Sequence, residues 1–70
     1  MEKDILCVRL VELRKEKKMS QQQVANEINV SRSSYSQYEL GTKQPNIQTL
    51  KLIAELHHCS IDYLVGRYEK

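Results

Sequence analysis

Two helix-start signals that lie close together between Met19 and Gly41 (MSQQQVANEINVSRSSYSQYELG) constrain the fold more than any other feature of this chain. Ser20 has Gln23 three residues later, the spacing of a capping box in which each side chain satisfies a backbone N–H of the other residue. Ser31 is a second N-cap candidate. Between the two starts stands Asn29, and asparagine tolerates a left-handed backbone better than most residues. The segment is therefore predicted to form two short capped helices joined by a tight turn.

The apolar residues of this segment fall on one side of each predicted helix. Val24, Ala25 and Ile28 share a face of the first helix, and Tyr35 and Tyr38 share a face of the second. The remaining face of the second helix consists of small polar side chains and one arginine: Arg32, Ser33, Ser36 and Gln37. In isolation these would be ordinary exposed residues. Here they follow a first capped helix and a short turn. This arrangement favours a helix-turn-helix over residues 20–39, whose second helix contacts base edges.

The rest of the chain predicts three more helices and no strand, so the expected fold class is all-α. The first helix would run from about residue 3 to 17, Asn46 and Ser60 would cap the fourth and fifth, and Gly41 and Gly66 would end the third and fifth. The side chains predicted to face the interior from these three helices are Leu6, Leu10, Leu13, Ile47, Leu50, Ile53, Ala54, Ile61, Leu64 and Val65.

Length and charge set the scale of what this chain can be. Residues 1–70 are expected to form one domain, near the lower size limit for a chain that folds without disulfides or metals. The net charge is only +2, but basic residues gather at the end of the first helix and beyond the third: Arg14, Lys15, Lys17, Lys18 and Lys43. Such a rim can bind phosphates, and its lysines also complement the dipole of the first helix.

Several classes of protein are excluded by what the sequence lacks. Cys7 and Cys59 are too few for a disulfide framework and are expected to be buried free thiols. The run His57-His58-Cys59 lacks the paired spacing of metal ligands, so neither a metal site nor a cofactor is expected. No catalytic constellation or phosphate-binding glycine loop is present, which indicates that the chain is not an enzyme and leaves no small-molecule ligand evident. Without a secretory leader or a membrane span, the expected compartment is the cytoplasm.

Five segments in register carry a family resemblance: Leu10, Leu13 and Arg14, then SQQQVA, NVSRSSYSQYELG, PNIQTLKLIAEL and SIDYLVG. With these segments the chain resembles the Xre/Cro/CI-type helix-turn-helix repressors from about Leu6 to Gly66. The resemblance implies a compact five-helix bundle of the lambda-repressor-like type with a central helix-turn-helix. It also implies a bacterial or phage regulator of transcription, expected to be a repressor that binds double-stranded DNA.

The resemblance implies roles for particular residues. The second helix of the helix-turn-helix would lie in the major groove, with Arg32, Ser33, Ser36 and Gln37 facing bases. The implied phosphate contacts are Gln21, Gln22, Ser31, Lys43 and Asn46. Arg14 and Glu39 correspond to a structural ion pair in relatives.

Three positions depart from the family pattern. Asn29 replaces the commoner glycine of the turn, at little expected cost. Tyr35 stands where a branched aliphatic residue is usual, so its hydroxyl must find a partner or reach solvent. His57 occupies a position often filled by leucine, which puts part of the packing of the fourth helix in doubt.

Apolar side chains in excess of one small core suggest an interface. The surplus includes Ile5, Val8 and Val11 on the first helix, and the candidate dimer contacts are Leu52, Leu56, Tyr63 and Tyr68. They predict a homodimer on a palindromic site, in which the second helices of the two helix-turn-helix segments lie about 34 Å apart. On the alternative interpretation these residues complete the core. A second possible function, from another class, is a protein-interaction module such as an antitoxin-like chain.

Overall fold

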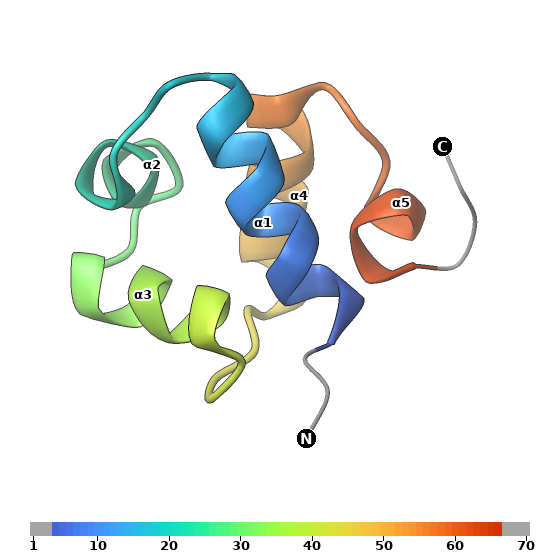
Figure 1. The fold of residues 1–70 in the computed structure, drawn as a ribbon. Helices are drawn as coiled ribbons and strands as arrows, with labels where there is room; N and C mark the ends of the chain where they lie inside the picture. The colour runs from blue at the N-terminus through green and yellow to red at the C-terminus, as the bar shows by residue number, and fades with distance from the viewer. Residues whose placement is uncertain (1–3, 67–70) are drawn as a thin grey trace.

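The computed structural model describes residues 4–66 and contains the five predicted helices in the predicted order (Figure 1). They are α1 (Ile5–Glu16), α2 (Gln21–Glu27), α3 (Arg32–Leu40), α4 (Ile47–His57) and α5 (Ile61–Val65). Residues 4–66 include no strand, and the all-α fold class is confirmed. The predicted start of the first helix, at residue 3, lies outside the described residues. None of the helices within residues 4–66 is long and apolar enough to cross a membrane.

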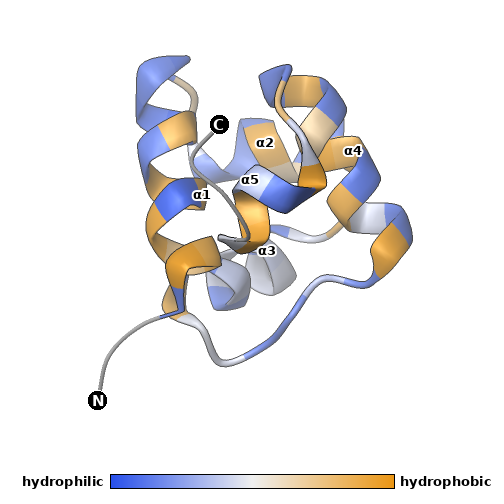
Figure 2. Ribbon diagram, turned by 90° about the vertical axis from the view of Figure 1, so that its right-hand side faces the viewer, coloured by the Kyte–Doolittle hydropathy of each residue, from blue (hydrophilic) through white to orange (hydrophobic). Residues whose placement is uncertain are grey.

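The helices surround one core. In Figure 1, α4 lies behind α1, with α2 and α3 on one side of them and α5 on the other; Figure 2, turned by 90°, shows α5 in front of α3. The closest helix pairs are α2 with α3, α1 with α3, α1 with α5, and α4 with α5. The side chains of the core are Leu6, Leu10, Val24, Ala25, Ile28, Tyr35, Tyr38, Leu50, Ile53, Ala54 and Leu64. Hence α3 rests on the core through its two tyrosines and leaves its opposite face outward.

Helix starts follow the predicted caps. Ser20 Oγ accepts a hydrogen bond from Gln23 N at 3.0 Å, and Gln23 Oε1 accepts one from Ser20 N at 2.8 Å, completing the capping box. Ser31, Asn46 and Ser60 each accept a hydrogen bond from the backbone N–H three residues later. Because each cap satisfies N–H groups that the helix itself cannot, the starts are fixed by neighbouring residues alone.

Helix ends are marked by left-handed residues. Asn29 (φ 61°), as predicted, follows α2, and Gly41 (φ 87°) ends α3. His58 (φ 54°) ends α4, and Gly66 (φ 84°) ends α5. Lys18 (φ 58°), between α1 and α2, was not predicted, because lysine carries no preference for this conformation.

Two predicted core residues are wrong. Ile47 is 61% exposed and Val65 is 38% exposed. Ile47 is the first residue of α4, and at this helix start Pro45 and Thr49 are buried instead. Val65 is the last residue of a five-residue helix, too short to turn more than Leu64 fully inward.

The hydroxyl of Tyr35 does not reach solvent and lies beside the side chains of Glu39 and Arg14. The side chain is fully buried, and its hydroxyl has no hydrogen-bond partner of regular geometry in the described part of the chain. Burial first, and the nearby carboxylate of Glu39 second, raise the pKa of Tyr35 far above its ordinary value. The edge of its ring packs against Tyr38, with the ring centroids 6.2 Å apart and nearly perpendicular.

His57, at the position where leucine is usual, brings polar atoms into the packing at the end of α4. The side chain is half-buried, and neither ring nitrogen has a hydrogen-bond partner among residues 4–66, although both are inaccessible to water. The ring borders an open pocket of about 380 Å³ between α1 and the α4–α5 connection. Burial, and then the positive charge of Lys17, lower the pKa of His57 below its ordinary value.

We expect His57→Leu to stabilise the fold and to reduce its sensitivity to acid. Because the folded-state pKa is lowered, the unfolded chain binds the proton more tightly, and stability is lost as the pH falls below about 6.5 toward the folded-state value. Removing two unpartnered nitrogens should add about 1 kcal/mol at neutral pH. The measurement is the melting temperature at pH 8 and pH 5, with His58→Asn as the control for loss of an exposed histidine. If the melting temperature of His57→Leu fell between pH 8 and pH 5 as much as that of the parent, His57 would not be the cause of the acid sensitivity.

The predicted dimer residues are only partly available to a partner. Leu52 and Leu56 are half-buried and pack against the core, which fits the alternative in which they complete it. Tyr63 is half-buried; the guanidinium of Arg9 lies 4.0 Å above its ring and donates a hydrogen bond to its backbone carbonyl. Tyr68 lies outside the described residues. Ile5 and Val8, which the sequence also placed in the apolar surplus, are exposed, and so are Leu40, Ile47 and Val65.

Candidate nucleic-acid interface

The outward face of α3 carries the four side chains predicted to contact bases. Arg32 and Ser33, in the first turn, are exposed, and Ser36 and Gln37, one turn later, are half-buried. All four lie on one side because positions one turn apart on a helix share a face. The face offers an arginine fork, two hydroxyls and an amide, which together match the donors and acceptors that base pairs present in the major groove.

The geometry between α2 and α3 is fixed by the turn. The left-handed backbone of Asn29 lets the chain reverse, and Val30 N donates a hydrogen bond back to Ala25 O at 3.0 Å. Ser31 then caps α3 at once through a hydrogen bond from Ser34 N. The two helices pack closely, so the outward face of α3 is held at one angle to the start of α2.

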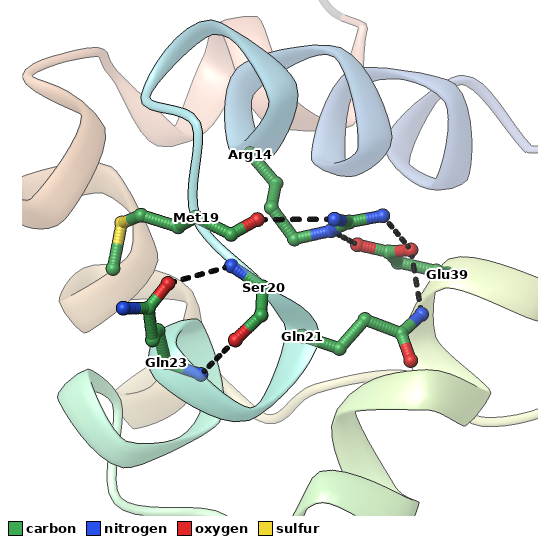
Figure 3. A network of polar contacts seen from close by, with 6 residues as sticks. All are labelled: Arg14, Met19, Ser20, Gln21, Gln23 and Glu39. Atoms are coloured by element: carbon green, nitrogen blue, oxygen red, sulfur yellow. Dashed lines mark hydrogen bonds and ion pairs between the residues drawn. The ribbon is translucent and has the colours of Figure 1, made fainter.

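A polar network joins α1, α2 and α3 (Figure 3). Arg14 Nε and Nη2 donate to the two carboxylate oxygens of Glu39, at 2.7 and 3.2 Å, which is a bidentate ion pair. A third donor of Arg14 reaches the carbonyl of Met19 at 3.1 Å. Gln21 Nε2 donates to Glu39 Oε1 at 2.9 Å. The pair thus lies where the resemblance placed it, and it also orients a residue predicted to contact phosphate.

Burial makes this pair energetically sensitive. Glu39 is 5% exposed, and its burial alone would raise the pKa. The hydrogen bond from Arg14, with help from Tyr35 and Gln21, outweighs burial and holds the pKa of Glu39 below its ordinary value. The same hydrogen bond to Glu39 raises the pKa of Arg14, so the pair is ionised at neutral pH.

The predicted phosphate contacts lie on both sides of the outward face. Gln21 and Gln22 stand in the first turn of α2, Gln22 exposed and hydrogen-bonded to Asn26 at 2.9 Å. On the other side, Lys43 Nζ donates to Ser34 Oγ at 3.2 Å. The oxygens of Ser31 and Asn46 are engaged as helix caps. Any phosphate contact of these two residues would therefore use the remaining donors of the hydroxyl or the amide.

The structure adds contacts that the sequence did not predict. Nothing in the spacing indicated that Gln21 binds Glu39 or that Lys43 binds Ser34, since each bond joins residues brought together only by the fold. Leu40 also points outward, at 59% exposed, from the last turn of α3. Its spacing of three and four residues from Gln37 and Ser36 was visible in the sequence.

Together, the fold and the flanked polar face of α3 define a helix-turn-helix domain. A family model described as helix-turn-helix matches residues 10–64. The chain therefore belongs to the helix-turn-helix family, in its Xre/Cro/CI-type branch, as the resemblance indicated.

Similar proteins agree with this assignment. The chain is 40% identical, over 60 residues, to the uncharacterized HTH-type transcriptional regulator YobD of Bacillus subtilis (strain 168). It is 42% identical, also over 60 residues, to the cryptic phage CTXphi transcriptional repressor RstR of Vibrio cholerae. Each match covers 86% of this chain and 54% of the relative, so the chain spans about half the length of these relatives.

A solved structure shares the arrangement of helices. The P22 c2 repressor, crystallised in complex with a synthetic operator, superimposes with a TM-score of 0.83 at 28% sequence identity. The match covers 93% of this chain and 96% of that chain. The five-helix fold is thus that of a repressor seen bound to DNA.

Proposed function

We propose that this chain is a sequence-specific, double-stranded DNA-binding regulator of transcription that acts as a repressor, with α3 in the major groove. The observation that carries the proposal is the outward face of α3, where Arg32, Ser33, Ser36 and Gln37 lie between possible phosphate contacts on α2 and on the loop after α3. A helix set between two anchors on the sugar–phosphate backbone can present its side chains to base edges. The repressors RstR and P22 c2 support the sign of regulation.

We also propose that the chain binds a palindromic operator as a dimer. A two-fold pair would place two copies of α3 about one turn of DNA apart, roughly 34 Å. The partly exposed Tyr63 supports an interface on the side of α5. Tyr68 belongs to the same prediction but lies outside the described residues.

Selection from randomised duplex DNA by the purified chain, at near-physiological salt, tests the proposal. A palindrome with fixed half-site spacing would support a dimeric, sequence-specific regulator. A single half-site would support base contact without the dimer, and sedimentation of the complex would then give one copy per site. Selection of nothing above background, with stoichiometric capture of a partner protein, would favour the protein-interaction module instead.

We expect Gln37→Ala to weaken binding to the selected site by about 1–3 kcal/mol and to relax preference at one base pair per half-site. The side-chain amide of glutamine can form hydrogen bonds with N6 and N7 of one adenine at the same time, and alanine can form neither. Gln37 does not belong to the core cluster, so truncation of its side chain should leave the fold intact. Repeating the selection with the variant measures the relaxed position. Equal affinity of variant and parent for the selected site would refute the assignment.

Lys43→Ala is the matched comparison. Lys43 is exposed and carries one charge beside α3, so its loss should weaken binding to all sequences alike. The slope of log K against log[salt] should fall by about one charge. A change confined to one base position would contradict its role as a phosphate contact.

A further inference from the structure

Leu40 is an exposed apolar side chain on a helix whose other outward residues are polar. It is 59% exposed, and among the described residues only Ile47, at 61%, matches it as an exposed large apolar side chain. The two residues before it, Tyr38 and Glu39, are buried in the core and in the ion pair. Since these two fix the last turn of α3, Leu40 has no inward position to occupy.

Around the helix axis, Leu40 lies within the face of α3 proposed to contact bases, at the C-terminal end of that face. Ser33, Ser36 and Gln37 precede it by seven, four and three residues, the spacings that share one face of a helix. At about 100° per residue, Leu40 falls between Ser36 and Ser33 around the helix axis. Whatever the polar side chains face, Leu40 therefore faces as well.

The C-terminal end of α3 is held in position by backbone hydrogen bonds and by a contact with α1. The N–H groups of Gly41 and Thr42 both donate to the carbonyl of Gln37, at 2.9 and 3.1 Å, which closes the last turn. A Cβ built on Gly41 would lie 3.0 Å from Cys7 Sγ, so the helix end touches α1. The exposed leucine thus projects from a fixed backbone.

The chemistry of the groove gives such a side chain one natural target. The side chain of leucine cannot form a hydrogen bond with a phosphate oxygen or with the polar edge of a base. The apolar group that base pairs present in the major groove is the C5-methyl of thymine. From Ser33 to Leu40 the helix rises about 10 Å, close to three base-pair steps.

We propose that Leu40 is a specificity-determining residue that contacts the C5-methyl of a thymine in each half-site. The thymine would lie next to the base pair contacted by Gln37, toward the C-terminal end of α3. The inference rests on the proposed function, since α3 must enter the major groove.

Replacing thymine by deoxyuridine, one position at a time in the selected operator, removes only the methyl. The affinities of the parent, Leu40→Ala and Ile47→Ala are measured for each duplex at one salt concentration. Ile47→Ala is the matched control, since it removes an equally exposed apolar side chain outside this face. We expect one deoxyuridine per half-site to weaken the parent and Ile47→Ala about threefold to fivefold, and Leu40→Ala hardly at all.

The possible results separate this inference from the proposed function. If the parent binds its selected site but Leu40→Ala keeps the same deoxyuridine sensitivity as the parent at every position, Leu40 does not contact a methyl. If Leu40→Ala weakens all duplexes alike and reduces self-association in sedimentation, the side chain belongs to a protein interface and the inference is wrong. If the parent selects no site at all, the proposed function fails first and the inference fails with it.

Discussion

Glu39→Ala is expected to lower the free energy of unfolding by about 2–4 kcal/mol, the largest loss of stability that we expect from changing a single charged side chain of this chain. Removing the carboxylate leaves Arg14, 17% exposed in the ion pair, with unpaired donors, and deprives Gln21 of its acceptor. A chain of this size has only about 4–10 kcal/mol in total. The melting temperature should therefore fall by about 10–25 °C, as measured by circular dichroism. A fall of only a degree or two would contradict the importance of the pair.

The double variant Arg14→Met with Glu39→Leu distinguishes loss of the ion pair itself from the cost of leaving one buried charge unpaired. Replacing a buried ion pair by apolar residues of similar size is often neutral, whereas breaking it by removing one partner is costly. We expect the double variant to recover most of the stability lost in Glu39→Ala. Its DNA affinity should nevertheless be lower than that of the parent, because Gln21 would lack the acceptor that orients it.

Ser36→Glu should abolish specific DNA binding while leaving the fold intact. Ser36 lies in the middle of the outward face and is half-buried, so a larger, negatively charged side chain there keeps α3 out of the groove. The new carboxylate would also lie one turn from Arg32 and pair with it, which favours the helix but occupies a proposed base contact. Affinity for the selected site should drop to the non-specific level, about 1,000-fold lower.

Two variants at the same position divide this effect into size and charge. Ser36→Ala removes only the hydroxyl and should cost at most one hydrogen bond to a base. Ser36→Gln has the bulk of glutamate without the charge and should give an intermediate affinity. Filter binding or fluorescence anisotropy on the selected duplex measures all three. Retention of full affinity by Ser36→Glu would mean that α3 does not enter the groove.

The fold of this chain could be predicted in detail because its determinants are local. Ser20, Ser31, Asn46 and Ser60 each start a helix through a side chain and a backbone group three residues away. Such signals do not depend on the rest of the chain, so helix order and most helix ends follow from the sequence.

What could not be predicted depends on distant residues or on the edge of the core. Periodicity places Ile47 with Leu50, but it does not reveal that Pro45 and Thr49 are the residues buried where α4 begins. The hydrogen bond from Gln21 to Glu39 joins two helices and leaves no trace in spacing. The resemblance placed Arg14 beside Glu39, yet only the structure shows that the pair also positions a residue of the proposed interface.

Because Cys7 contacts Gly41 at the end of α3, its thiol can report chemically on local opening at this contact. Cys7 is 3% exposed, and its sulfur lies against the end of α3, so a thiol reagent reaches it only when the structure around it opens. The rate of labelling, compared with that of the unfolded chain, gives the free energy of this local opening. Cys59→Ala would leave Cys7 as the single thiol of the chain. Opening of the structure around Cys7, where α1 meets the end of α3, can then be timed with and without operator, without attaching any label to the proposed DNA-facing surface.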